Sequence, residues 1–248
     1  MKRYGLIGYP LSHSFSQRYF TDKFEREGIR DCQYSNFSLP AIGALSSVLA
    51  DTTLCGLNVT IPYKQQVMPF LNTLSAVVEE IGACNCIRIE AGRLTGYNTD
   101  VVGFERSLVR QLSPHHRMAL VLGTGGASKA VEYVLRKLGI GYRRVSRSPG
   151  PEHKDGGGDL GYDQVDAGIL SEALLIINTT PVGMYPRVDE CPPLPYEALT
   201  SRHYLFDLIY NPERTLFLQK GEARGAAVEN GQEMLILQAE ESWRIWNS

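Results

Sequence analysis

The first hundred residues alternate between short apolar runs and segments whose apolar positions recur at helical spacing. The apolar runs predict strands at residues 4–8, 32–37 and 56–60. The helical spacing predicts helices at residues 16–27, 40–49 and 72–81. Asn72 is expected to be the N-cap of the last of these helices. Residues 84–94 predict a hairpin that turns at Ala91 and Gly92.

A second set of elements begins at residue 118. An apolar run at residues 118–122 leads through Gly123-Thr124-Gly125-Gly126 into a predicted helix at 127–138 and a strand at 142–146. This order predicts a βαβ unit with a parallel sheet. Further elements are expected as strands at 174–177 and 204–208, a loop at 149–161, and helices at 215–224 and 232–246. The boundary between the two sets is predicted near residues 99–104.

Composition and charge exclude several classes of protein. The 248 residues suffice for one large domain or two modest ones, and 43% apolar with 21% charged residues is typical of a globular protein. The formal net charge of −2 gives no basic field for nucleic acid or an anionic membrane. The longest uncharged run, residues 32–50, is too polar to span a bilayer, and no signal peptide is visible.

Cysteine and histidine residues show no spacing that predicts a metal site. The five cysteines are an odd, scattered set, and Cys84-x-Cys86 lacks the second pair of a structural zinc site. We therefore expect reduced cysteines, no metal, and a cytoplasmic protein.

The glycine turn after residue 122 is the first candidate for chemistry. Backbone amides at the start of a helix bind a pyrophosphate, and glycines let the backbone approach it. Gly123-x-Gly125-x-x-Ser128 departs from the dinucleotide fingerprint at the third glycine, so a plain turn stays possible. The next strand ends near three arginines in place of the acid that NAD requires: Arg143, Arg144 and Arg147. Arginines suit a 2′-phosphate and favour NADP, the alternative being a solvated basic face.

Three polar motifs follow predicted strands in the first half of the chain. Asn58-Val59-Thr60-Ile61-Pro62-Tyr63-Lys64 ends a strand with a proline and a lone lysine. Gly96-Tyr97-Asn98-Thr99-Asp100 and Ser12-His13-Ser14-Phe15-Ser16 are the other two. Loops at the carboxyl ends of strands are where α/β sheets bind ligands. Each motif also has a simpler interpretation: Lys64 as a surface lysine, Thr99 or Asp100 as a helix cap, and one of the serines as a helix cap.

Together these motifs resemble the shikimate dehydrogenase family. The resemblance covers nearly the whole chain in eight ordered blocks: Gly8-Tyr9-Pro10-x-x-His13-Ser14-x-Ser16, Asn58-Val59-Thr60-x-Pro62-x-Lys64, Gly82-Ala83-x-Asn85, Gly96-x-Asn98-Thr99-Asp100, Gly123-x-Gly125-Gly126-Ala127, Asn178-Thr179-Thr180-Pro181-x-Gly183-Met184, Asp207-x-x-Tyr210-x-Pro212-x-x-Thr215 and Asn230-Gly231-x-x-Met234-Leu235-x-x-Gln238-Ala239.

The resemblance implies an α/β fold of two domains. A substrate-binding domain is expected at residues 1–101 and a Rossmann-type NADP-binding domain with a parallel sheet at 102–229, while the helix in 230–248 returns to the substrate domain. The implied reaction is the reversible NADPH-dependent reduction of 3-dehydroshikimate to shikimate in aromatic amino-acid biosynthesis. The implied binding partner is the small-molecule substrate, shikimate or 3-dehydroshikimate, and binding to nucleic acid or a membrane is not expected. The protein is expected to be a monomer or a homodimer.

The resemblance also implies the roles of individual residues. Lys64 and Asp100 correspond to the catalytic pair. The substrate-binding positions are Ser14, Ser16, Thr60, Asn85, Tyr210 and Gln238. The cofactor-binding positions are Gly123, Thr124, Gly125, Gly126, Ala127, Ser146, Arg147, Ser148, Thr179, Leu208 and Gly231.

Two departures from the family pattern stand beside this resemblance. Gln17 replaces the usual proline after the second serine, and Ser146-Arg147-Ser148 replaces the common Asn-Arg-Thr. A quinate or dual quinate/shikimate dehydrogenase shares nearly all the blocks and stays an alternative. A catalytically silent NADP-binding regulator is a further alternative, although it is expected to have lost Lys64 or Asp100, and both are present.

Overall fold

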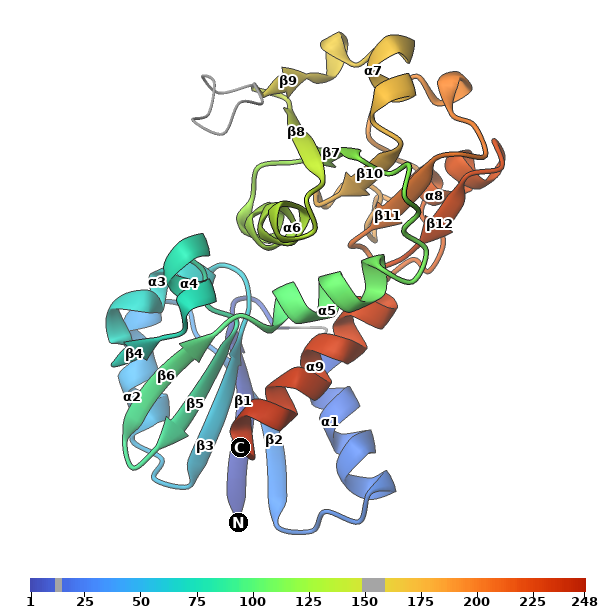
Figure 1. Cartoon of the computed structure of the whole chain (residues 1–248). Helices are drawn as coiled ribbons and strands as arrows, with labels where there is room; N and C mark the ends of the chain where they lie inside the picture. The colour runs from blue at the N-terminus through green and yellow to red at the C-terminus, as the bar shows by residue number, and fades with distance from the viewer. Residues whose placement is uncertain (12–14, 149–158) are drawn as a thin grey trace. The chain divides into compact units, whose positions relative to one another are not determined.

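A computed structural model describes residues 1–11, 15–148 and 159–248. The chain divides into two compact units, each with its own sheet. The first unit contains Met1–Thr99 together with Ala239–Ser248, and the second contains Asp100–Gln238. The α/β fold predicted from the sequence is confirmed in both units (Figure 1).

The first unit is built on a mixed six-stranded sheet in the order β2-β1-β3-β5-β6-β4. β5 runs antiparallel to β3 and β6, and the other pairings are parallel. Its elements are β1 (Lys2–Gly8), α1 (Phe15–Arg26), β2 (Cys32–Ser38), α2 (Leu45–Leu49), β3 (Leu54–Val59), α3 (Tyr63–Gln66), β4 (Thr73–Leu74), α4 (Ala76–Ile81), β5 (Cys86–Glu90) and β6 (Arg93–Tyr97).

An aromatic cluster packs the end of the chain onto this sheet. Trp246, near the end of α9 (Gln232–Trp246), stacks on Tyr4 of β1 with ring centroids 4.9 Å apart. Its indole N–H donates to the Ile87 carbonyl at 3.0 Å. A Cβ at Gly56 of β3 would lie 2.3 Å from the Trp246 indole nitrogen, so only glycine fits beneath this ring. The last turns of α9, drawn in red in Figure 1, therefore belong to the first unit.

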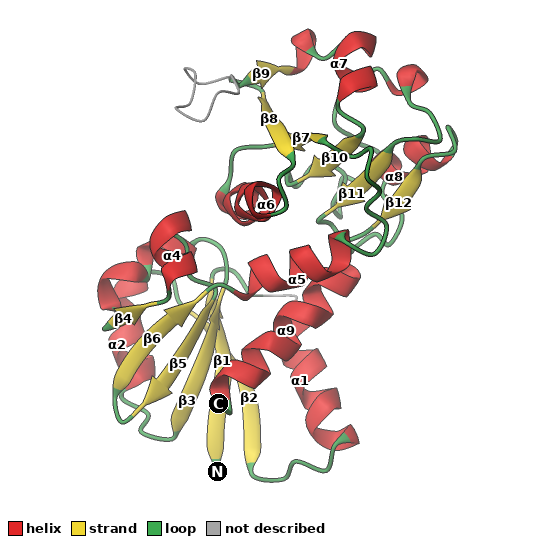
Figure 2. Ribbon diagram, in the orientation of Figure 1, coloured by secondary structure: helices red, strands yellow, loops and turns green. Residues whose placement is uncertain are grey.

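The parallel sheet predicted for the second unit is confirmed, and it has six strands in the order β12-β11-β10-β7-β8-β9 (Figure 2). The chain moves outward from β7 to β8 and β9, then returns to the other side of β7 at β10. Its elements are α5 (Thr99–Leu108), β7 (Met118–Leu122), α6 (Gly126–Lys137), β8 (Gly141–Ser146), β9 (Leu160–Gly161), α7 (Ala167–Glu172), β10 (Leu175–Asn178), β11 (Tyr204–Asp207), α8 (Leu216–Glu222), β12 (Ala227–Glu229) and α9.

The order of strands reverses between β7 and β10, which makes this the switch point of the sheet. Ligands of open α/β sheets bind outside the carboxyl ends of the strands at such a point. The carboxyl end of β7 leads into the glycine turn, and the carboxyl end of β10 leads into Thr179. The fold thus brings two of the predicted cofactor positions to the same place.

Some local predictions were wrong. Asn72 caps no helix: its side-chain oxygen accepts from the Leu94 amide at 2.8 Å, and β4 pairs with β6 where the first helical turn was expected. Ser75 is the N-cap of α4. The helix predicted at 40–49 is α2 preceded by a single 3₁₀ turn, Ile42–Ala44. Of the loop predicted at 149–161, residues 149–158 lie outside the described residues, and Leu160–Gly161 is strand β9.

Candidate active site

The polar motifs of the first unit meet at one edge of its sheet. β1, β3 and β6 all end at this edge, and the antiparallel β5 begins there, because Asn58 pairs with Cys86 and Cys86 pairs with Tyr97. Thr60 follows β3, Asn85 precedes β5, and Thr99 follows β6. The expectation that the motifs at residues 58–64 and 96–100 follow strands is therefore confirmed, while residues 12–14 of the third motif lie outside the described residues.

Asn85 is held in one orientation by the backbone and side chain of Thr99. Its Oδ1 accepts from the Thr99 amide at 2.6 Å, and its Nδ2 lies 3.1 Å from the Thr99 hydroxyl. Both residues are buried. Since the carboxamide oxygen already accepts from an amide, the amide nitrogen is the part of Asn85 suited to donate to a ligand.

Lys64 and Asp100 are each half-buried in the first turn of a helix. Lys64 is the second residue of the short helix α3, and its carbonyl accepts from the Cys84 amide at 2.8 Å, which ties this helix to the segment before β5. Asp100 is the second residue of α5 and the first residue of the second unit. Ser16 is half-buried at the start of α1, and Ser14 lies outside the described residues.

The glycine turn of the second unit leaves its backbone open. Gly125 is the N-cap of α6, and a Cβ at Gly125 or Gly126 would meet no described atom within 4 Å. Packing within the described protein therefore gives no reason for glycine at these two positions, whereas the close approach of a ligand does. The exposed turn includes Thr124, and half-buried Ala127 follows in α6.

Glycine is required by close contacts at two other cofactor positions. Gly123 has a φ of +105°, and a Cβ there would lie 2.9 Å from the Thr179 hydroxyl oxygen. The Thr179 hydroxyl donates to the Leu122 carbonyl at 2.7 Å, which holds the ends of β7 and β10 together. A Cβ at Gly231 would lie 2.1 Å from the Leu208 carbonyl oxygen. Four of the predicted cofactor positions thus form two close pairs within the second unit.

The three arginines near the end of β8 differ in their surroundings. Arg144 donates through Nε to Asp159 at 2.7 Å, and both side chains are largely buried. Arg144 is therefore neutralised within the protein by Asp159. Arg147 and Ser148 are exposed, while Ser146 is buried and its hydroxyl has no hydrogen-bond partner among the described residues. Arg147 is the arginine best placed to meet a phosphate.

Asp207 is a buried carboxylate at the carboxyl end of β11. Its Oδ2 accepts from the Thr215 hydroxyl at 2.6 Å, and its Oδ1 accepts from Asn178 Nδ2 at 3.0 Å and the Ile209 amide at 3.1 Å. Burial raises the pKa of Asp207 to about 6, against the lowering effect of these hydrogen bonds. The sequence analysis named this residue in one block of the family resemblance but gave it no role, although a charge directly after the apolar run 204–206 was a signal.

Asp207 predicts a dependence of stability on pH. Its folded-state pKa lies above the unfolded value of 3.8, so its stabilising contribution is complete below pH 3.8 and is lost as pH rises through about 6. The difference corresponds to about 3 kcal/mol. Asp207→Asn has the shape of the protonated acid and does not titrate.

Urea unfolding of both proteins between pH 4 and 7 tests this. We expect the stability of Asp207→Asn relative to the unmodified protein to rise by up to about 3 kcal/mol across this range. Parallel stability curves for the two proteins would show that Asp207 does not titrate in this way.

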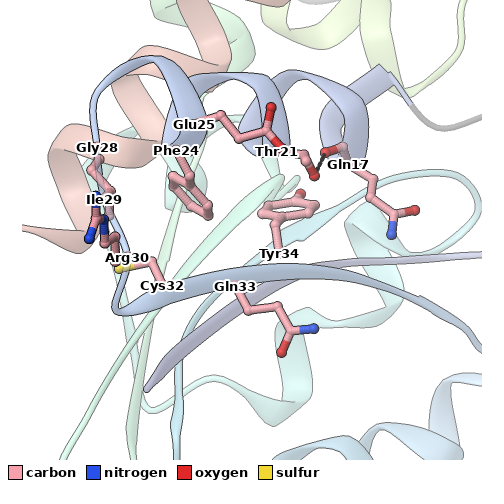
Figure 3. Close-up of a pocket in the computed structure, with 10 residues that line it drawn as sticks. All are labelled: Gln17, Thr21, Phe24, Glu25, Gly28, Ile29, Arg30, Cys32, Gln33 and Tyr34. Carbon is pink, nitrogen blue, oxygen red and sulfur yellow. Dashed lines mark hydrogen bonds between the residues drawn. The ribbon is translucent and has the colours of Figure 1, made fainter.

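Two grooves, one on each unit, lie away from these positions. The larger, of about 670 Å³, lies between α1 and β2 and is lined by the residues drawn in Figure 3. A smaller one of about 370 Å³ lies beside α8. Neither is lined by a predicted site residue. Over residues 1–11, 15–148 and 159–248, no three His, Cys, Asp or Glu side chains are placed to hold a metal ion. Within the same ranges, no helix is both long and apolar enough to cross a membrane.

The parallel sheet, its switch point and the open glycine turn place the second unit in the class of dinucleotide-binding α/β domains. Residues 6–87 match the family model of the shikimate dehydrogenase substrate binding domain. The chain is 37% identical over 250 residues to an NADP⁺ shikimate dehydrogenase of Clostridium beijerinckii, covering 99% of this chain and 92% of the relative.

Two solved structures extend this similarity to the whole fold. A shikimate dehydrogenase in complex with NADP⁺ superposes with a TM-score of 0.87 at 32% identity, over 99% of this chain and 90% of that one. The Thermus thermophilus enzyme, solved with NADP(H) and shikimate, gives a TM-score of 0.86 at 31% identity, over 99% and 93% of the two chains. This chain belongs to the shikimate dehydrogenase family.

Proposed function

We propose that this protein is an NADP-dependent shikimate dehydrogenase that reversibly reduces 3-dehydroshikimate to shikimate, a step of aromatic amino-acid biosynthesis. The observation that carries the proposal is a similarity covering nearly the full length of relatives that have this activity by name. The polar sheet edge of the first unit and the open glycine turn of the second agree with it.

The residues of the second unit fit a dinucleotide. The amides at the start of α6 and the unfilled space at Gly125 and Gly126 suit a pyrophosphate. Exposed Arg147 suits a 2′-phosphate, with Ser146 and Ser148 beside it. We assign Thr179, Leu208 and Gly231 to the remainder of the cofactor, at the carboxyl ends of β10, β11 and β12. When bound, NADPH supplies the hydride.

We propose Lys64 and Asp100 as the catalytic pair. Negative charge grows on the ketone oxygen as a carbonyl carbon is reduced, and a positioned ammonium group stabilises that charge and donates the proton. We assign this role to Lys64. Asp100 is proposed to orient the ammonium group and to accept a hydrogen bond from a substrate hydroxyl. In the reverse direction Lys64 takes the proton back from the alcohol.

The remaining assignments concern the substrate and its domain. A small carboxylated ring with several hydroxyls suits recognition by hydroxyl and amide side chains, and we assign this role to Ser14, Ser16, Thr60, Asn85, Tyr210 and Gln238. We keep residues 1–101 as the substrate domain, 102–229 as the NADP domain, and 230–248 as the returning segment. The last assignment is supported by the packing of Trp246 on β1.

Two further proposals concern the state of the protein. A cytoplasmic location is supported by the cysteines, because no disulfide joins any two of the five. The protein is proposed to act as a monomer or a homodimer.

Gln238 provides a test of the substrate assignment. Its side chain is 7% exposed, and its Nε2 donates to the Leu235 carbonyl at 3.0 Å, so it does not lie on a solvent-facing surface. It is seven residues after Gly231, or roughly 10 Å along a helix, about the span from a cofactor ring to the far side of a small cyclic substrate. Gln238→Ala is expected to raise KM for shikimate several-fold and leave KM for NADP nearly unchanged.

Steady-state kinetics with each substrate varied in turn measures both values. Gln219→Ala is the matched control, because Gln219 is exposed on α8 and also donates to a backbone carbonyl, that of Arg214 at 2.8 Å. An unchanged shikimate KM in folded Gln238→Ala would contradict the assignment.

The choice between shikimate and quinate is decided by relative rates. We expect shikimate with NADP to be turned over faster than quinate with either NADP or NAD. A higher rate on quinate would assign the protein to the alternative dehydrogenase, and NADP binding without turnover of either substrate would indicate a regulator.

A further inference from the structure

A chain of buried polar side chains connects five elements of the first unit. It joins Tyr34 of β2, Asn58 of β3, Ser242 of α9, Thr99 at the start of α5, and Asn85 before β5. All five residues lie in the same compact unit. Each is at most 4% exposed, and Thr99 and Ser242 are 0% exposed. Polar groups this deeply buried are costly unless they are hydrogen-bonded to one another.

The orientation of Asn58 follows from its neighbours. Its Nδ2 lies 2.9 Å from Ser242 Oγ and 3.4 Å from the Asn85 carbonyl oxygen. A carbonyl can only accept, so this end of the Asn58 carboxamide is the donor. Its Oδ1 then faces Tyr34, whose hydroxyl donates to it at 2.8 Å. The ring of Tyr34 lies between α1 and β2 in Figure 3, where burial holds the pKa of its hydroxyl well above the ordinary value.

Ser242 links the Asn58 carboxamide to Asn85, the predicted substrate residue, by way of Thr99. Its Oγ lies 3.2 Å from the Thr99 hydroxyl, which is in turn 3.1 Å from Asn85 Nδ2. Ser242 also lies four residues after Gln238 in α9, so the two side chains emerge from the same helical face. A single hydroxyl therefore connects the returning helix to both Asn58 and Thr99.

We propose that Ser242, Asn58 and Tyr34 are positioning residues that fix the Asn85 carboxamide and the Thr99 start of α5 for shikimate binding. The inference rests on the proposed function, because it acts through the substrate role assigned to Asn85. Thr99 is joined to Asp100 by a peptide bond, so the same chain fixes the backbone from which Asp100 projects. None of the three positioning residues contacts substrate in this account; they hold the residues that do.

Ser242→Ala tests the central link. The change leaves Asn58 Nδ2 and the Thr99 hydroxyl each without one buried partner, and their rearrangement releases Asn85 from its present geometry. We expect kcat/KM for shikimate to fall about tenfold, mainly through KM, because misplacement of a substrate contact weakens binding. KM for NADP is expected to stay within about twofold, since the cofactor positions lie in the second unit.

Ser107→Ala is the matched control. Ser107 is also a 0% exposed helical serine, in α5, but its hydroxyl has no partner among the described residues. Removing it breaks no described hydrogen bond, so both KM values are expected to stay within about twofold of the unmodified protein. Tyr34→Phe tests the far end of the chain and removes one oxygen. We expect it to raise KM for shikimate about threefold. Because the Tyr34 hydroxyl also hydrogen-bonds Ser16, a proposed substrate residue, Ser242→Cys decides the matter if Ser242→Ala does not fold.

The outcomes separate this inference from the proposed function. Turnover of shikimate by the unmodified protein, with folded Ser242→Ala and Tyr34→Phe both within about twofold of it, would overturn the positioning role alone. An equal rise in KM for shikimate and for NADP would also overturn it, because that indicates general destabilisation. Absence of turnover by the unmodified protein would overturn the proposed function and this inference with it.

Discussion

Lys64→Ala is expected to lower kcat by roughly 10²–10⁴-fold while changing the affinity for shikimate much less. The side chain follows the strand-ending Thr60 and the proline turn, at the polar edge of the first sheet. In the proposed mechanism its ammonium group stabilises charge that appears mainly in the transition state. An interaction of that kind changes kcat more than KM.

Single-turnover and steady-state rates with NADP and shikimate measure this effect. Lys64→Arg keeps the positive charge but releases a proton reluctantly, so it is expected to retain more binding than turnover. Lys2→Ala removes an exposed lysine from β1 in the same unit and is expected to leave both constants unchanged. A near-normal kcat for Lys64→Ala would remove Lys64 from the mechanism.

Arg147→Ala is expected to weaken NADP binding by roughly 10–100-fold and to leave NAD binding nearly unchanged. A hydrogen bond to a charged group contributes about 1.5–3 kcal/mol, and each 1.4 kcal/mol is about a factor of ten in affinity. Arg144 is already paired with Asp159, so we do not expect it to replace Arg147 at the 2′-phosphate. Titration of each cofactor by fluorescence or calorimetry gives the two dissociation constants.

Arg143→Ala is the matched control for this prediction. Arg143 lies within β8 and carries the same charge, so its removal measures the general effect of losing one positive charge. We expect its effect on NADP to be much smaller and to disappear at high salt. If Arg147→Ala weakens NADP and NAD equally, the arginine is structural and does not read the 2′-phosphate.

The sequence was most informative where a local pattern sets the local structure. The hairpin between β5 and β6 turns at Ala91 and Gly92 as predicted, and both residues have positive φ, which a two-residue turn of this type requires. The βαβ unit from β7 to β8 was likewise predicted almost to the residue. In both cases a glycine-containing turn between neighbouring elements sets the local structure.

Predictions failed where distant segments decide the outcome. Asn72 has the features of a helix cap, but its oxygen accepts from Leu94, which is distant in sequence and pairs in a sheet. The sequence analysis made no prediction for Lys23, whose side chain is 5% exposed and pairs with Glu240 of α9 at 2.9 Å. Such long-range pairing carries no periodic signal in the sequence.

The same limit applies to the candidate site. A motif at a strand end singled out Thr60, because loops at the carboxyl ends of strands are where α/β sheets bind ligands. Asn85 was named only through the family resemblance, since it precedes a strand. No pattern around Ser242 indicates that its hydroxyl meets Asn58 from 184 residues away. Arg144 resembles Arg147 in sequence, and only the partner Asp159 distinguishes the two.

The most direct test of the account is the absorbance of NADPH when the purified protein is mixed with shikimate and NADP⁺. We expect steady formation of NADPH that depends on both substrates and is nearly abolished in Lys64→Ala. Formation of no NADPH by folded protein that binds NADP⁺ would contradict the assignment of this chain as a shikimate dehydrogenase.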